Sequence, residues 1–406
     1  MKKILAFVLA LVMVLSMTAC GAKAEDKFTV GAIYINSKND TAGYTFAHHS
    51  GITKAMEELG MDPATQLVIV DNVPEDDEQV LAAIDTLVGS GADIIFGISF
   101  GYLYAMEEKA AEYPEVIFSH GTGFLSNSTN FNNYFGRAYQ ARYLSGIAAG
   151  MKSLEMNNNN IGYVAAFGTD YAETASGING FALGVQAVNP NAIVYVKNLN
   201  NWADEVNEKA YAEELISSFG CGVISQHCDS AQPQIAAQNA GVFGCGYNSD
   251  MTPDAPKAHL TSAIWNWNVY YGTAIKAAME CETAADFVTK MGGNAYYGGL
   301  KEGFVDVSPL SENCAPNTAE IIDAVKAMMV SGEWDVFSGV KLQIDAATGT
   351  VTKVDAALES NGFMYADGNF AVPMENTVVV EAGGPSVDDG VIKGSMNYLV
   401  KGVEEA

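Results

Sequence analysis

The run FTVGAIYI (28–35) is short, apolar and rich in β-branched residues, and a segment with helical periodicity follows it. The same alternation continues along the chain, with strands predicted over 66–70, 92–99 and 115–120 and helices over 47–59, 78–88 and 102–113. Strands that alternate with helices are typical of βαβ units, in which helices cover both faces of a parallel sheet. The N-terminal part of the chain is therefore predicted to form an α/β lobe.

A second set of alternating segments follows a polar break at 157–160. Its strands are predicted over 161–167, 192–199, 221–226, 241–248 and 259–264, and its helices near 172–188, 204–219 and 230–240. The segment GRAYQARYLSGIAAGMK (136–152) joins the two sets and is predicted to act as a hinge. Ligands of open α/β sheets bind at the carboxyl ends of the strands, so we expect a binding site between two doubly wound, parallel-sheet lobes.

The predicted boundaries place the first lobe at 28–140 and the second at 141–264. Residues 265–406 are expected to complete both lobes, with a Gly-rich insertion at about 357–390. A hairpin that turns at Thr348 and Gly349 precedes this insertion.

The N-terminus has the pattern of a secretory signal peptide. Lys2 and Lys3 precede an apolar run, which is shorter than the roughly 20 residues of a spanning helix and is followed by Cys20. We expect cleavage after residue 19, lipidation of Cys20 and a flexible tether over 20–27. The alternative is a secreted protein that is cleaved near Ala24.

The composition is acidic, with a formal net charge of −27, and loss of the two signal-peptide lysines makes it more so. This charge argues against a nucleic-acid partner. Five cysteines remain besides Cys20, and their spacing is not that of a metal finger. Buried free thiols are expected for these cysteines, and a metal cluster of His227, Cys228 and Cys245 is the less favoured alternative.

The sequence contains none of the common hydrolase, metalloprotease or nucleotide-binding motifs. His48 and His49 are adjacent and do not share a helix face, so solvated or capping roles are expected. Aromatic and amide side chains instead gather at the predicted strand ends, which favours recognition of a flat heterocycle with polar edges. For each aromatic residue the alternative is ordinary core packing. No enzyme activity, cofactor or metal is predicted.

Six blocks carry a resemblance to a known family: YTFAHHSGITKAME (44–57), SFGYLYAMEEKAAEYPEVIFSHGTG (99–123), GRAYQARYLSGIAAG (136–150), NNWADE (200–205), ISQHCDSAQPQIAAQNAGVFGCGYNSDM (224–251) and LTSAIWNWNVYYG (260–272). Through them the chain resembles the BMP ("basic membrane protein") family of ABC-transporter substrate-binding lipoproteins. The resemblance implies the type I periplasmic-binding-protein fold and a purine nucleobase or nucleoside as ligand. It also implies permease and ATPase partners, a monomer, and an extracytoplasmic protein held at the membrane only by its lipid.

By position in these blocks, Tyr44 and Trp202 resemble the two aromatic residues that stack on opposite faces of the purine. Asn248 stands where nucleoside-binding relatives have an aspartate for the ribose, and Trp265 stands where they often have a lysine. These differences imply that a free base binds at least as well as its riboside. The full predicted set is Tyr44, Thr45, Ser99, Phe100, Trp202, Asp204, Gln226, Asn248, Asp250 and Trp265.

Arg137 and Arg142 are expected to form salt bridges that orient the lobes. Two other functions are compatible with this fold. One is a surface-anchored ligand sensor, and the other is a nucleoside-cleaving enzyme, for which the sequence offers no acid cluster of suitable spacing.

Overall fold

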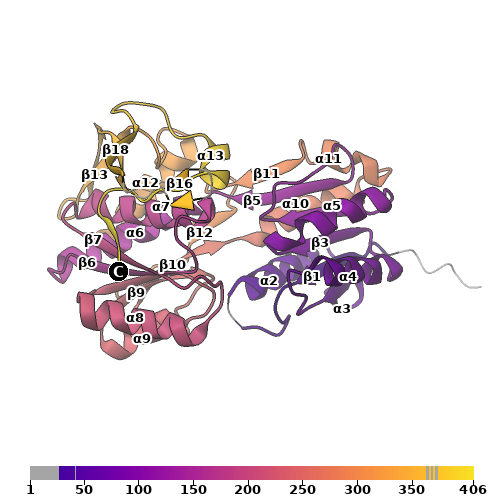
Figure 1. Cartoon of the computed structure of the whole chain (residues 1–406), viewed down its shortest axis with the longest axis horizontal. Helices are drawn as coiled ribbons and strands as arrows, with labels where there is room; N and C mark the ends of the chain where they lie inside the picture. The colour runs from indigo at the N-terminus through magenta and orange to yellow at the C-terminus, as the bar shows by residue number, and fades with distance from the viewer. Residues whose placement is uncertain (1–26, 42, 363–364, 367–368, 371–373) are drawn as a thin grey trace, which may run out of the picture.

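A computed structural model describes residues 27–41, 43–362, 365–366, 369–370 and 374–406, which form two α/β lobes with additional C-terminal elements (Figure 1). The predicted signal peptide and Cys20 lie outside the described residues. In the part of the chain that is described, no helix is both long and apolar enough to cross a bilayer.

The first lobe contains a parallel sheet with the strand order β11-β5-β4-β3-β1-β2. Its strands are β1 (Val30–Tyr34), β2 (Leu67–Val70), β3 (Ile94–Ile98), β4 (Ile117–Gly121), β5 (Phe131–Gly136) and β11 (Ala295–Gly298). The helices are α2 (Gly43–Glu58), α3 (Pro63–Gln66), α4 (Asp77–Gly89), α5 (Leu103–Glu112), α10 (Trp267–Met279) and α11 (Phe287–Lys290). The two faces of β1 belong to different cores, because Ala32 packs with residues of α2 and α10 whereas Ile33 packs with residues of α4 and α5.

The second lobe has the strand order β12-β10-β9-β8-β6-β7-β19, in which the β12 to β10 pairing is antiparallel and the others are parallel. Its strands are β6 (Asn160–Ala165), β7 (Ile193–Asn198), β8 (Val223–His227), β9 (Phe243–Asn248), β10 (His259–Trp265), β12 (Val305–Val307) and β19 (Val403–Glu405). The helices of this lobe are α6 (Ala138–Glu155), α7 (Ala172–Val188), α8 (Glu205–Phe219), α9 (Gln232–Ala240) and α12 (Thr318–Ser331).

Within the described residues, the chain passes between the lobes at three places: from β5 to α6, from β10 to α10, and from β11 to β12. The segment 136–152, predicted as the hinge, includes only the first of these connections. Most of the segment is helix α6, which packs in the second lobe. The predicted boundary at 140/141 falls within α6. Residues after 265 supply α10 and β11 to the first lobe, and β12, α12 and β19 to the second.

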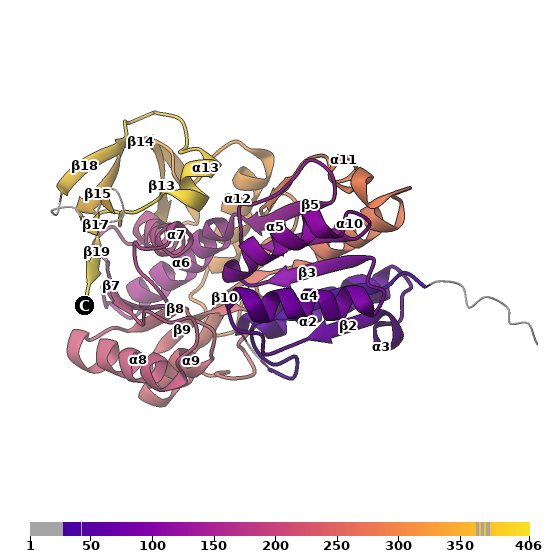
Figure 2. The same ribbon diagram turned by 45° about the vertical axis from the view of Figure 1, so that its right-hand side comes forward.

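The C-terminal elements lie against the second lobe, above α6 and α7 in Figure 2. Strands β13 (Val340–Asp345) and β14 (Thr350–Asp355) form the predicted antiparallel hairpin, and Gly349 at its turn has a φ of 70°. The region predicted as an insertion contains β15 (Leu358–Gly362), which pairs with β18 (Met374–Val380), and the short strands β16 (Tyr365–Ala366) and β17 (Asn369–Phe370). Helix α13 (Asp389–Gly394) then packs on α7.

Helices α6 and α7 approach so closely that glycine is required at their contact. A Cβ atom at Gly184 would lie 2.1 Å from the backbone oxygen of Tyr143, and one at Gly146 would lie 2.2 Å from that of Phe181. Side chains therefore cannot be inserted without moving one helix backbone.

Candidate functional site

The two lobes touch where the N-terminus of α2 meets the loop after β8. Gly43 has a φ of 83°, and a Cβ atom there would lie 2.7 Å from the backbone oxygen of Asp229. The backbone amide of Tyr44 donates a hydrogen bond to the Asp229 carboxylate. Polar side chains that gather around this contact are called here the interlobe cluster, which consists of Tyr44, Arg142, Glu173, His227, Asp229 and Asn248.

Asp229 is the centre of this cluster. Nδ2 of Asn248 donates to Oδ1 of Asp229 at 2.9 Å, and Asn248 itself is held in a left-handed conformation with a φ of 68°. Burial raises the pKa of Asp229 to about 7, with a further contribution from the nearby carboxylate of Glu208. Oδ1 of Asn248 is buried and has no hydrogen-bond partner among the described residues.

A second acid, Glu173, lies in the first turn of α7. Burial raises its pKa to about 8, whereas the positive charge of Arg142 opposes that rise. Its Oε1 atom lies 3.7 Å from Nε2 of His227. Burial and Arg142 together lower the pKa of His227, so this histidine is neutral at pH 7.

Arg142 is fully buried on α6. Nη1 donates to the backbone oxygen of Gln226, and the guanidinium lies 3.9 Å from the centre of the Tyr247 ring. Its Nε and Nη2 atoms have no partner among the described residues. Unpaired donors of a buried cation are costly, so they favour a bound molecule that presents acceptors.

One aromatic residue of each lobe contacts Asp229 through its backbone. On the first lobe, the Tyr44 ring packs edge-on against His48 at 4.2 Å, and the Tyr44 hydroxyl is buried without a partner among the described residues. On the second lobe, the Trp202 ring packs against Phe167 at 5.1 Å, and the backbone oxygen of Trp202 accepts a hydrogen bond from the amide of Asp229. The two residues predicted to stack on a purine thus adjoin the same aspartate.

Two further residues of the predicted set lie near the cluster. Thr45 follows Tyr44 in α2, and its buried hydroxyl has no partner among the described residues. Trp265 ends β10, stacks on Trp267 at 4.6 Å, and donates from Nε1 to the hydroxyl of Tyr247 at 3.2 Å. Trp265 therefore reaches the cluster through Tyr247, the ring that Arg142 covers.

The structure does not bring Asp204, Gln226 or Asp250 into the cluster. Asp204 caps α8 by accepting from the amide of Asn207 at 3.1 Å. The amide nitrogen of Gln226 donates to the backbone oxygens of Cys228 and Ser230, and its side-chain oxygen accepts from Gln234. Asp250 stabilises a surface turn by accepting from the amide and hydroxyl of Thr252.

Ser99 and Phe100 likewise contact residues outside the interlobe cluster. The Ser99 hydroxyl donates to Oε1 of Glu75 at 2.6 Å. Phe100 is 42% exposed and packs against Phe124, which is 60% exposed. Both predictions followed from position at the end of β3, which does not determine where a side chain points.

Sequence reasoning missed Glu173, His227 and Asp229 as members of the site. The predicted strand 221–226 ends one residue before β8 does, so the strand-end position points to Gln226, whereas Asp229 lies two residues beyond His227, where β8 ends. An acidic residue directly after a predicted strand, as in CDS (228–230), is the sequence signal that could have identified Asp229.

The expected roles of the arginines and histidines were partly wrong. Arg137 forms the expected ion pair, with Asp389, through both Nε and Nη2. Arg142 has no carboxylate within 4.0 Å among the described residues and belongs to the cluster instead. His48 was expected to be solvated or capping, but it is fully buried and stacks on Trp267 at 3.8 Å.

The described cysteines are free thiols. Cys221, Cys228 and Cys245 are buried, as favoured above, and Cys281 and Cys314 are partly buried. Within the described ranges, no group of three or more His, Cys, Asp or Glu side chains is placed to hold a metal ion.

Comparison with known proteins places this chain among ABC-transporter substrate-binding proteins. The family model described as ABC transporter substrate-binding protein PnrA-like matches residues 28–332. The chain is 32% identical to a purine-binding protein of Brucella abortus, over 80% of this chain and 87% of that protein. It is 33% identical, over 79% of this chain and 78% of the relative, to a Haloferax volcanii protein to which glucose binding for an ABC transporter is ascribed.

Solved structures show the same fold. An ABC-transporter solute-binding protein from Aeropyrum pernix has a TM-score of 0.61 at 19% identity, over 78% of this chain and 93% of that one. One from Conexibacter woesei has a TM-score of 0.59 at 18% identity, over 76% and 98% of the two chains. The fold is therefore that of the type I periplasmic solute-binding proteins, as the resemblance implied.

Proposed function

This chain belongs to the PnrA-like family of ABC-transporter substrate-binding proteins, and from that premise we propose that it captures a purine nucleobase or nucleoside between its lobes. The observation that supports the proposal is the interlobe cluster, in which buried polar atoms without a partner among the described residues occur around Asp229, where Tyr44 of the first lobe and Trp202 of the second lobe meet. The purine-binding relative from Brucella abortus points to the same ligand class.

The chemistry of the cluster suits the edge of a purine. The carboxylate of Asp229 is an acceptor for ring N–H and exocyclic amino groups, whereas Glu173, with a pKa of about 8, is mostly protonated at pH 7 and can donate its O–H to a ring nitrogen or a carbonyl oxygen. Nε and Nη2 of Arg142 are donors for ring nitrogens or carbonyl oxygens. The rings of Tyr44 and Trp202 would stack on the two faces of the base.

We also propose that a free base binds at least as tightly as its riboside. The side-chain amide of Asn248 already donates to Asp229, which leaves one neutral acceptor at this position. A neutral hydrogen bond contributes about 0.5–1.5 kcal/mol, compared with about 1.5–3 kcal/mol for one to a charged group. A hydrogen bond from a sugar hydroxyl to Asn248 therefore contributes less binding free energy than one to an aspartate at this position would.

A hexose is the second candidate, because a glucose-binding role is ascribed to the Haloferax volcanii relative. Isothermal titration calorimetry with adenine, guanine, xanthine, their ribosides and glucose separates the two. We expect stoichiometric binding of at least one purine and no heat from glucose. Heat of binding from glucose and none from any purine would contradict the proposal and indicate a sugar-binding protein.

The affinity for adenine is expected to decrease as the pH is lowered below 7. Asp229 has a raised pKa of about 7 in the free protein, and the groups that act on it are Glu208 and Asp40, which raise it, and Asn248 and the Tyr44 amide, which lower it. A carboxylate that accepts N–H bonds must be ionised, so binding has to remove a proton at low pH. The dissociation constant should rise about tenfold or more between pH 7.5 and pH 5.5.

Asp229→Asn should bind adenine weakly at every pH and show little of this dependence in calorimetry. Asp204→Asn is the matched control, because that carboxylate serves only helix α8. A wild-type affinity that does not change over this pH range, with an equal affinity in Asp229→Asn, would remove Asp229 from the site.

The transport role also requires a receptor held near its permease and ATPase. We propose that Cys20 carries this anchor as a diacylated cysteine, since two acyl chains bind a bilayer stably. Acyl labelling of the wild type and its loss in Cys20→Ala, together with release from the membrane fraction, would support the anchor. Labelling that persists in Cys20→Ala would reject it.

A further inference from the structure

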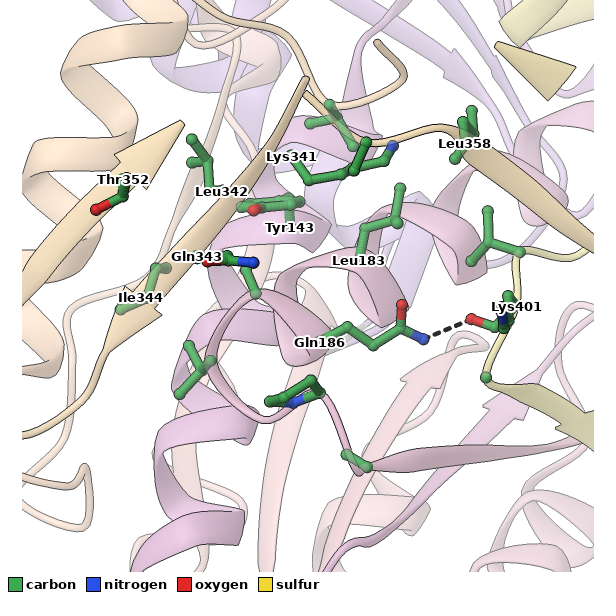
Figure 3. Close-up of a pocket in the computed structure, with 18 of the residues that line it drawn as sticks. Tyr143, Leu183, Gln186, Lys341, Leu342, Gln343, Ile344, Thr352, Leu358 and Lys401 are labelled. Carbon is green, nitrogen blue, oxygen red and sulfur yellow. Dashed lines mark hydrogen bonds between the residues drawn. The ribbon is translucent and has the colours of Figure 1, made fainter. Parts of the chain in front are cut away.

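A pocket of about 1150 Å³ lies on the second lobe, between helices α6 and α7 and the β13–β14 hairpin (Figure 3). Apolar side chains of the helices, Tyr143 and Leu183, face Leu342 and Ile344 of β13 across it. None of the residues of the interlobe cluster lines this pocket. Its outer wall is built from residues after 332, where the match to the family model ends.

Lys341 of β13 is a partly buried cation that lines this pocket. Its Nζ atom donates to the backbone oxygen of Ser338 at 2.9 Å, and among the described residues no carboxylate lies within 4.0 Å of it. Figure 3 shows the side chain extending from β13 toward Leu358. Burial lowers the pKa of Lys341 to about 8, and no neighbouring acid raises it.

The other charged side chains at the pocket are satisfied within the protein. Lys401 pairs with Glu359 at 3.0 Å, and its backbone oxygen accepts from Gln186 at 2.6 Å. Asp345 accepts from the amides of Ala347 and Thr348 in the hairpin turn. Lys341 is therefore the partly buried charge at this pocket for which the described residues supply no counter-ion.

We propose that this pocket binds a small amphipathic anion, whose charged group pairs with Lys341 and whose apolar body packs against Tyr143, Leu183 and Leu342. Partial burial without a counter-ion destabilises the charged form of Lys341, and an anion placed beside it offsets that cost. The volume is sufficient for a ligand of ordinary small-molecule size. Because the walls come from one lobe and the C-terminal elements, binding here does not require the lobes to close.

The full chain is titrated with two fluorescent probes that share an aromatic skeleton, the anion anilinonaphthalene sulfonate and the neutral phenylnaphthylamine. We expect one sulfonate probe per chain, bound more tightly than the neutral probe, and an unchanged affinity in the presence of saturating adenine. Lys341→Met retains the unbranched stem and should weaken the sulfonate probe about tenfold or more, while the neutral probe is unaffected.

Lys353→Met is the matched control, since it removes the same charge from the neighbouring strand, where Lys353 pairs with Glu333 at 2.7 Å. It should leave both probes unchanged. If Lys341→Met does not fold, Lys341→Gln keeps a donor for Ser338 and is measured in its place. Equal sulfonate binding in the wild type and the Lys341 variant, an equal loss in Lys353→Met, or displacement of the probe by adenine would each overturn the proposal.

Discussion

Trp202→Ala is expected to weaken purine binding by about one to two orders of magnitude. Stacking of a base on an aromatic ring contributes roughly 1–3 kcal/mol, and each tenfold change in affinity corresponds to about 1.4 kcal/mol. Trp202 is half-buried and lies at the edge of its lobe against Phe167 and Tyr171, so the variant should remain folded. Calorimetry with the best purine measures the loss.

Trp202→Phe is the matched control, because it retains a ring for stacking and should lose much less affinity than Trp202→Ala. Phe124→Ala removes an exposed aromatic side chain of the first lobe and should leave binding unchanged. If Trp202→Ala binds purine as tightly as the wild type, the second-lobe stacking residue has been assigned wrongly.

Gly184→Ala is expected to lower the free energy of unfolding by about 3 kcal/mol, at the upper end of the usual range for overpacking. The new methyl group would lie 2.1 Å from the backbone oxygen of Tyr143, which belongs to the facing helix and cannot rotate away as a side chain can. Helices α6 and α7 must therefore separate along the core of the second lobe. Chemical denaturation followed by circular dichroism measures the change.

Gly89→Ala is the control for the intrinsic effect of the substitution. Gly89 is the last residue of α4, and no atom lies within 4 Å of the position that a Cβ atom would occupy. Alanine favours helix over glycine by up to about 1 kcal/mol, so this variant should be neutral or slightly more stable. Equal stability of Gly184→Ala and the wild type would show that the helices are not in backbone contact.

Most strands of both sheets could be predicted because they are β-branched apolar runs between helical segments. Strand β5, with the sequence FNNYFG (131–136), was missed because asparagine and glycine are typical of turns. In the folded protein Asn132 is buried, and its amide donates to the hydroxyl of Tyr270 at 2.9 Å. A partner 138 residues away in the sequence thus compensates for the polar side chain, which a local pattern does not reveal.

The candidate site was only partly predictable for a related reason. Trp202 and Asn248 follow from the predicted strand ends, where cleft residues of this fold are expected, and Tyr44 follows from its position in the block YTFAHHSGITKAME (44–57) that carries the family resemblance. Asp229 lies in a loop and Glu173 lies at the start of a helix. Acidic residues at such positions commonly cap helices, as Asp204 does for α8. Burial between two lobes gives them a different role, and that burial depends on the tertiary structure.

Mass spectrometry of the small molecule released when the purified protein is denatured tests the central claim most directly. The full exported chain is produced in cells, purified without added ligand, and denatured, and the released fraction is compared with that from Trp202→Ala. We predict a purine base or nucleoside in stoichiometric amount from the wild type and much less from the variant. Release of a hexose without purine would contradict the account.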